Sequence, residues 1–132
     1  MIVVDTNVIA YLFIKGEYSK QAKKVIELDS DWISPILWKS EFRSVLALYI
    51  RKGYLSPKDA YSILKEAEYF MESNEYEANS SDILELVNNS NCSAYDCEFV
   101  ALAQRLDLKL YTSDKQILKN FPGIAVSLSE VE

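Results

Sequence analysis

With 132 residues, 49% of them hydrophobic and 26% charged, the chain fits one globular domain with a single sizeable core. It contains no histidine, which excludes Ser-His-Asp and Cys-His catalysis as well as histidine-bound zinc, and leaves carboxylates, Lys, Tyr, Cys or an oxygen-bound metal ion. The net charge of −6 argues against tight non-specific binding of nucleic acid, but not against metal-mediated cleavage of a phosphodiester.

Neither a membrane span nor a signal peptide is predicted. No apolar run approaches the roughly 18 residues that a span requires. The N-terminal sequence MIVVDTNVIAYL lacks the basic start and the small-residue cleavage site of a secretory signal. We therefore expect a cytoplasmic protein with no membrane partner, in which Cys92 and Cys97 have structural or incidental roles rather than a redox role.

The first half of the chain alternates short apolar strands with amphipathic helices. Pro35 is expected in the first turn of the third helix, which Gly53 ends as a C-terminal cap. Ser56 and Pro57 have the N-cap and first-turn pattern of a fourth helix. In chain order the predicted elements are a strand at 1–5, helices at 7–14 and 19–28, a strand at 32–34, and helices at 36–51 and 57–71.

The second half continues the alternation and contains no hairpin turn signal. Its predicted elements are a strand at 75–78, helices at 80–87 and from Ser93 through CEFVALAQRL, a strand at 108–111, a short helix at 114–118 and a strand at 124–126. We find no internal repeat and no domain boundary. The pattern predicts a single α/β domain over residues 1–132, with a parallel sheet covered by helices on both faces.

Asp5 and Asp114 each follow a predicted strand. Asp5 comes directly after the apolar run at 2–4, and Asp114 follows the strand at 108–111 through two polar residues. Ligands of open parallel sheets gather beyond the carboxyl ends of the strands, so both side chains could reach one site if the two strands adjoin. The alternative for each is a structural role as the N-cap of the next helix.

Glu41 lies in the most apolar helical segment, PILWKSEFRSVLALYI. Helical spacing places it among apolar neighbours, on or at the edge of a buried face. A carboxylate there is costly unless it is paired or metal-bound, which favours a functional role. The alternative is an exposed position on the polar stripe of the same helix.

Asp96 has a stronger structural alternative. Ser93 and Asp96 form a pattern like a capping box at a helix start, where the helix dipole favours an acidic residue. Alone, this pattern indicates a structural role. Glu98 points elsewhere on the same helix and is expected to face solvent or to lie behind the ligands.

Together the four acids predict a metal site. Asp5, Glu41, Asp96 and Asp114 could converge on one crevice, two from strand ends and two from helices. Converged carboxylates repel one another strongly unless a cation is present. Ligands that are all oxygen select Mg²⁺ or Mn²⁺ over zinc.

Four segments carry these acids, in the order MIVVDTNVI, SPILWKSEFRSVL, SAYDCEFVALAQ and LYTSDKQIL. In this order, and over nearly the whole chain, they resemble the PIN domain, and closely the VapC-type toxins of bacterial and archaeal toxin–antitoxin pairs. The resemblance implies a PIN-like three-layer α/β/α sandwich with a central parallel sheet. It also implies an endoribonuclease that uses Mg²⁺ or Mn²⁺.

The resemblance also assigns roles. The implied catalytic residues and metal ligands are Asp5, Glu41, Asp96 and Asp114. The residues that match polar, substrate-positioning places around them are Thr6, Thr112 and Ser113. Ser44 stands where relatives often carry Asn, which weakens any role for that position. Such toxins commonly form homodimers and are inhibited by a small antitoxin, so the expected partners are RNA, an antitoxin and a second copy.

The expected reaction is metal-assisted hydrolysis of an RNA phosphodiester, which leaves 5′-phosphate and 3′-hydroxyl ends. Lys15, Lys39 and Arg43 could contact the RNA backbone, but solvated surface charge is the favoured interpretation. The aromatic residues that could stack on bases, for which core packing is favoured, are Tyr11, Trp32 and Trp38.

Two rival functions keep this fold. One is a structure-specific DNA nuclease of the flap type, but the chain offers neither added duplex-binding elements nor a basic surface. The other is a catalytically silent interaction module, against which the full set of four acids argues.

Overall fold

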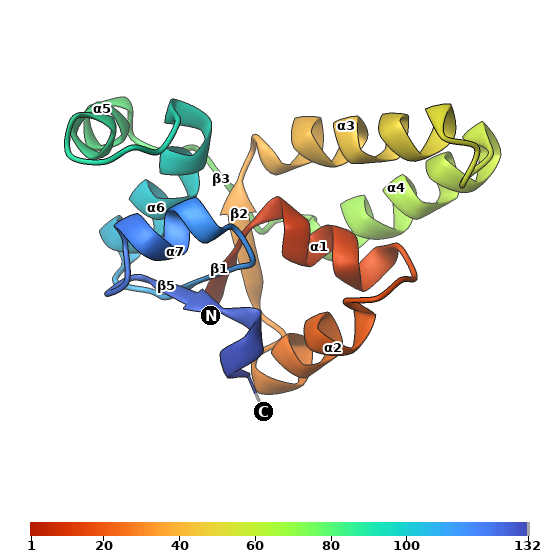
Figure 1. Ribbon diagram of the computed structural model, residues 1–132, viewed down its shortest axis with the longest axis horizontal. Coiled ribbons are helices and arrows are strands. Elements are labelled where there is room, and N and C mark those ends of the chain that lie inside the picture. The colour runs from red at the N-terminus through yellow and green to blue at the C-terminus, as the bar shows by residue number, and fades with distance from the viewer. Residues whose placement is uncertain (132) are drawn as a thin grey trace.

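A five-stranded parallel sheet lies at the centre of the computed structural model, which describes residues 1–131 (Figure 1). The strand order is β3-β2-β1-β4-β5, and every pair of neighbours is parallel. The bounds are β1 Ile2–Val4, β2 Trp32–Pro35, β3 Glu75–Tyr76, β4 Leu110–Thr112 and β5 Ala125–Ser127. Strands β1 and β4 adjoin, with Val4 opposite Tyr111, so the segments that carry Asp5 and Asp114 leave the sheet side by side.

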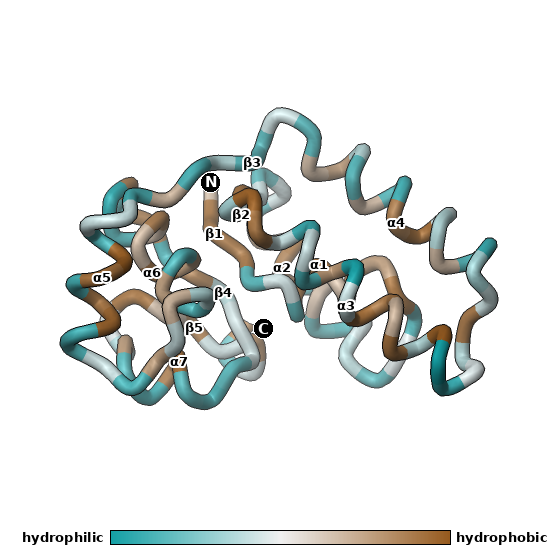
Figure 2. Tube along the Cα trace, turned by 90° about the horizontal axis from the view of Figure 1, so that it is seen from above, coloured by the Kyte–Doolittle hydropathy of each residue, from teal (hydrophilic) through white to brown (hydrophobic). Residues whose placement is uncertain are grey.

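Strands β1 and β2 are largely apolar because they are covered on both faces. All residues of β1 and β2 are buried, and Figure 2 shows both strands as largely hydrophobic segments near the centre of the molecule. A strand with two buried faces reads as a continuous apolar run rather than an alternating one. Ser34 is the polar exception, and its hydroxyl donates to the backbone carbonyl of Val4.

Seven α-helices within residues 1–131 form the outer layers (Figure 1). The helices on one face are α1 Thr6–Phe13, α2 Ser19–Leu28, α3 Trp38–Arg51 and α4 Pro57–Met71. The helices on the other face are α5 Ser80–Asn88, α6 Ala94–Leu106 and α7 Lys115–Asn120. A 3₁₀-helix, Leu128–Glu130, follows β5. The predicted three-layer α/β/α sandwich is confirmed.

The core fills the space between the sheet and both helical layers. Its largest fully buried side chains include Trp32, Trp38, Phe42 and Phe99. Both tryptophans therefore pack in the core, as favoured from the sequence, and neither is available to stack on a base. Cys92 and Cys97 are buried free thiols. No helix in the described part of the chain is both long and apolar enough to cross a bilayer.

Local capping signals predicted several helix ends correctly. Ser56 caps α4 by accepting the Asp59 backbone N–H at 3.0 Å, with Pro57 at the first helical position. Gly53 follows α3 with φ of 76°, a left-handed conformation that a residue without Cβ adopts at little cost.

The prediction for Pro35 was wrong. Instead of starting a helix, it is the last residue of β2 and pairs with Tyr76, and α3 begins at Trp38. The ladder to β3 uses the N–H groups of Ser34 and Ile36, so the missing N–H of Pro35 falls between two bonds. The third strand is also shorter than predicted, and β4 lies one to two residues later.

Candidate active site

Asp5 is the centre of a polar network at the carboxyl end of β1. It caps α1, because Oδ1 accepts the Thr6 backbone N–H at 2.8 Å. Oδ2 accepts the Thr112 hydroxyl at 2.7 Å and the Asn7 side-chain amide at 3.4 Å. The side chain is almost fully buried, with 7% of the residue exposed. The structural and functional interpretations of Asp5 are therefore compatible, since the cap fixes the carboxylate in place.

Thr6 connects Asp5 to the helix that carries Glu41. The buried Thr6 hydroxyl donates to Oε1 of Glu41 at 2.7 Å. Glu41 lies one turn into α3 and is half-buried, as expected for a position at the edge of the apolar face. This contact joins residues 35 positions apart and orients the Glu41 carboxylate toward the start of α1.

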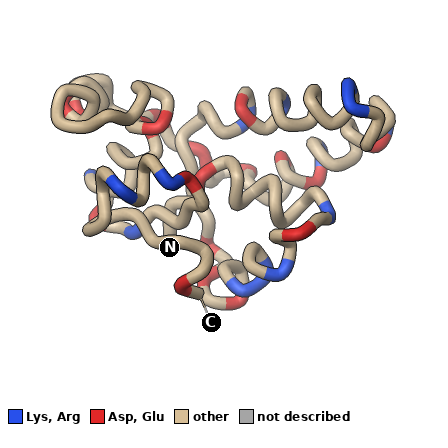
Figure 3. The backbone as a smooth tube through the Cα atoms, in the orientation of Figure 1, with Lys and Arg blue, Asp and Glu red and all other residues tan. Residues whose placement is uncertain are grey.

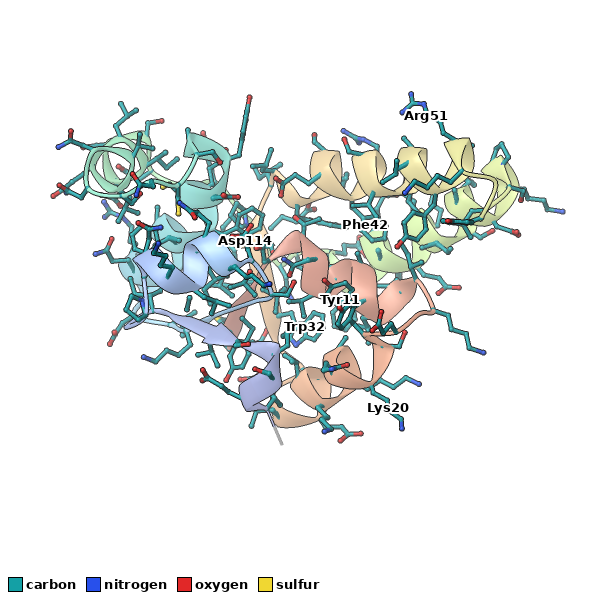
Figure 4. The ribbon with its side chains drawn as sticks, viewed as in Figure 1. Tyr11, Lys20, Trp32, Phe42, Arg51 and Asp114 are labelled. Atoms are coloured by element: carbon teal, nitrogen blue, oxygen red, sulfur yellow. The ribbon has the colours of Figure 1, made fainter. Side chains whose placement is uncertain are left out.

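Thr112 makes the matching connection on the other side. Its buried hydroxyl donates to Asp5 and accepts the backbone N–H of Asp114 at 2.9 Å. Asp114 in turn caps α7 by accepting the Ile117 N–H at 3.0 Å, and its side chain is half-buried (Figure 4). Two threonine hydroxyls thus link the carboxylates of Asp5 and Glu41 and the backbone of Asp114 into one hydrogen-bonded chain.

Asp96 approaches the same place from the first turn of α6. Ser93 caps this helix by accepting the Asp96 N–H at 3.1 Å, which fixes the backbone of the acid. Burial raises the pKa of Asp96, and the charge of Asp114 raises it further. The two carboxylates are therefore close enough to repel each other.

Like charges meet throughout this cluster. Burial is the main cause that raises the pKa of Asp5 to about 7, against hydrogen bonds from Thr112 and Thr6, and the charges of Glu41 and Asp96 add to the rise. The pKa of Glu41 is raised first by burial and then by the charges of Asp96 and Glu98, while its hydrogen bond from Thr6 acts in the opposite direction. Acids from four distant segments thus lie within electrostatic range of one another at this end of the sheet.

The acidic cluster has no basic counter-charge among residues 1–131. None of Asp5, Glu41, Asp96, Glu98 and Asp114 forms an ion pair with Lys or Arg there. A set of partly buried oxygen donors without a protein cation fits a hard divalent ion such as Mg²⁺ or Mn²⁺. No three acidic or cysteine side chains of the described residues are already arranged to hold one ion. A shared ion therefore requires side-chain rotations among the half-buried Glu41, Asp96 and Asp114.

Ser113 lies beside the acidic cluster rather than in it. Its hydroxyl is 3.0 Å from the Tyr11 hydroxyl, and its backbone N–H donates to Oδ1 of Asn7 at 3.4 Å. Ser44 is exposed on α3. Lys39 is held by Glu68 and Glu75 at 3.5 and 3.8 Å, which leaves it engaged away from the cluster.

Two residues that sequence reasoning had not assigned to the site, Asn7 and Glu98, also contribute to it. Asn7 bridges Asp5 and the backbone of Ser113, and its only sequence signal is its place one residue beyond Thr6. Glu98 is half-buried, its pKa is raised by that burial, and its charge reaches Glu41. Of the two positions expected for Glu98, facing solvent or lying behind the ligands, the burial favours the second.

A family model for the PIN domain matches residues 2–123. The chain belongs to the PIN domain family. The fold described above is thus that of a PIN domain.

One curated PIN domain relative is Ribonuclease VapC3 of Pyrobaculum aerophilum, which is 29% identical over 126 residues and is aligned over 93% of this chain and 96% of the relative. Among solved structures, PAE2754 from Pyrobaculum aerophilum has a TM-score of 0.77 at 19% identity, covering 97% of this chain and 90% of that one. A toxin–antitoxin complex from Klebsiella pneumoniae has a TM-score of 0.66 at 21% identity, covering 97% and 98%. FitAcB from Neisseria gonorrhoeae has a TM-score of 0.74 at 17% identity, covering 98% and 99%. These structures share the PIN fold.

Proposed function

We propose that this chain is a divalent-metal-dependent endoribonuclease that acts in the cytoplasm as the toxin of a VapBC-type toxin–antitoxin pair. The observation that carries the proposal is the meeting of Asp5, Glu41, Asp96 and Asp114 at one end of the sheet, without a basic partner among residues 1–131. The likeness to Ribonuclease VapC3 supports RNA as the substrate.

The four acids are the proposed ligands of Mg²⁺ or Mn²⁺. A bound ion supplies orientation of the scissile phosphate, a lower pKa of the attacking water, and stabilisation of charge on the departing 3′-oxygen. Asp5 is held in a single orientation by Thr6 and Thr112, so it is the fixed member of the set. Glu41 is oriented by the Thr6 hydroxyl alone and keeps its second oxygen free of protein hydrogen bonds within residues 1–131.

Two protein partners belong to the proposal. The Klebsiella pneumoniae relative is a toxin–antitoxin complex, which supports a small antitoxin as the inhibitor of this chain. Resemblance to VapC-type toxins supports a homodimer. Light scattering of the purified chain, alone and with the product of a neighbouring short reading frame, tests both partners.

Cleavage of single-stranded RNA in the presence of Mn²⁺ or EDTA tests the activity. The wild type is expected to cut in Mn²⁺ and not in EDTA, and Asp5→Asn is expected to lose at least about a hundredfold in rate, because it removes the fixed ligand. Asp107→Asn is the matched control. Asp107 is exposed at the end of α6 with φ of 54°, a conformation that Asn tolerates well, so this variant should cut like the wild type.

The same assay separates the rival functions. A flap-type DNA nuclease would cut branched DNA in Mn²⁺ and leave RNA intact. A silent interaction module would leave both substrates intact in Mn²⁺ while still binding its protein partner. Either result would overturn the proposal.

A further inference from the structure

A hollow of about 290 Å³ lies beside the acidic cluster, where α1 and α2 face the start of α7 and the segment after β5. Ser113 and Lys115, the two chain neighbours of Asp114, both line it. Tyr11 and Tyr18 form its aromatic wall, and Gln21 adds an amide. We call this hollow the Tyr11–Tyr18 pocket. Its lining thus includes the residues on either side of Asp114 in the chain.

The aromatic wall is held in place and partly open. The ring centroids of Tyr11 and Tyr18 are 4.8 Å apart with an interplanar angle of 36°. The hydroxyls of Tyr11 and Ser113 are 3.0 Å apart, so a hydrogen bond ties the wall to the residue before Asp114. Tyr18 packs against Tyr11 and is still 45% exposed, which leaves aromatic surface available to a flat ligand.

Positive charge lies around this pocket in an otherwise acidic chain. Lys115 is exposed at the rim. On α2, Lys24 is one helical turn beyond Gln21 and therefore on the same face, with Lys20 one turn before Lys24. Figure 3 shows α2 as a basic segment, and Figure 4 shows Lys20 at the surface. None of these three lysines forms an ion pair with another described residue, so they are free to meet an anion.

We infer that the Tyr11–Tyr18 pocket receives an unpaired nucleobase of the RNA, in the nucleotide next to the bond that is cut. The inference rests on the proposed function. Tyr18 stacks on the base, Gln21 and Ser113 offer hydrogen bonds to its edge, and Lys115 contacts the adjoining phosphate. An aromatic platform with nearby cations is how proteins hold single-stranded nucleic acid. A base inside a duplex cannot enter a pocket of this size, so the substrate is single-stranded RNA or a loop.

Steady-state cleavage kinetics of a single-stranded RNA in Mn²⁺ test the inference. Tyr18→Leu removes the ring and keeps an apolar side chain, so KM should rise roughly tenfold or more while kcat changes little. Tyr18→Phe keeps the ring and should match the wild type. Tyr69→Leu, at another exposed tyrosine on α4, is the matched control and should change neither constant. An unchanged KM in Tyr18→Leu would overturn the inference.

A second readout is independent of cleavage. In Asp5→Asn, which does not cut the RNA, 2-aminopurine is placed at each position next to the mapped cut in turn. Fluorescence should be quenched at one position when anisotropy shows the RNA bound, and the quenching should disappear when Tyr18→Leu is added. Quenching that persists without the ring contradicts the inference.

The failures of the two proposals are distinguishable. If the wild type cuts no RNA, the proposed function fails. If the wild type cuts single-stranded RNA but Tyr18→Leu has the same KM, only the pocket assignment fails. If Tyr18→Leu does not fold, Lys115→Gln addresses the same pocket, and it should raise KM severalfold with kcat nearly unchanged.

Discussion

Asp5 combines a helix cap with a buried charge, and its titration gives the first prediction. Its pKa is 3.8 in the unfolded chain and about 7 in the metal-free fold. Between these values the unfolded carboxyl is ionised while the folded one keeps its proton, so stability falls as the pH rises and the loss is complete above 7. Asp5→Asn has no such carboxyl and should escape this loss. Urea unfolding with EDTA should therefore show that its free energy of unfolding, relative to that of the wild type, rises by about 2–3 kcal/mol from pH 5 to pH 8.

The control for this experiment is again Asp107→Asn, which changes an exposed acid to its amide at a left-handed position. Its stability difference from the wild type should not change between the two pH values. If the wild type and Asp5→Asn lose stability in parallel as the pH rises, Asp5 is not the group with the raised pKa.

The Thr6 hydroxyl is predicted to act through Glu41. It donates to Glu41 Oε1 at 2.7 Å, and this bond lowers a pKa that burial raises. Thr6→Val keeps the shape of the side chain and removes the donor. We expect the Mn²⁺ concentration for half-maximal cleavage to rise by about tenfold or more, as is typical when a residue that orients a ligand is lost.

Thr6→Ser restores the hydroxyl and should restore the Mn²⁺ requirement. Equal Mn²⁺ dependence of the valine variant and the wild type would show that Glu41 needs no orientation from α1.

At the scale of elements, two serine caps provide a matched pair. Ser93 caps α6, which carries Asp96, and Ser56 caps α4, which carries none of the acidic cluster. Each Ser→Ala change should cost about 1 kcal/mol of stability, because each leaves one N–H of a first turn without its partner.

Only the α6 variant should affect the reaction. Ser93→Ala loosens the first turn of α6, which holds Asp96 in place. It also removes a hydrogen bond that lowers the pKa of Asp96, so kcat/KM should fall severalfold. Ser56→Ala should leave kcat/KM unchanged. Urea unfolding and RNA cleavage measured on both variants check the prediction. Equal activities of the two variants would show that catalysis does not depend on how Asp96 is held.

Elements whose signals are local could be predicted from the sequence. The cap at Ser56 and the glycine after α3 act within a few residues of where they stand, so their patterns predicted helix ends correctly. Pro35 could not be placed in the same way, because its role depends on pairing with β3, some 40 residues away in the chain. A strand whose missing N–H falls between two ladder bonds has no local signature.

In the acidic cluster too, positions with a local sequence signal could be predicted, and contacts between distant helices could not. Asp5 and Asp114 could be found because each follows an apolar strand, and the adjoining of β1 and β4 brings those strand ends together. The contact of Glu41 with Thr6, and the approach of Glu98 to Glu41, depend on how α3 and α6 pack. One sequence contains no information on that packing beyond which helix faces are apolar.

For the whole molecule, the cluster predicts that metal binding and folding are coupled. The fold holds its acids together against their repulsion, so an ion that binds only the folded chain should stabilise it. At pH 8 and an Mn²⁺ concentration about 100 times the Kd, binding should add about 2.7 kcal/mol to the free energy of unfolding, or raise the Tm by on the order of 5–10 °C.

At pH 5.5 the same Mn²⁺ must displace the proton of Asp5, whose pKa is about 7. The apparent affinity should therefore be roughly 30-fold weaker, and the rise in Tm much smaller. Thermal unfolding with and without Mn²⁺ at both pH values measures the coupling, and Asp5→Asn should show little rise at either. Equal stabilisation of the wild type at pH 5.5 and pH 8 would mean that the ion does not bind at Asp5.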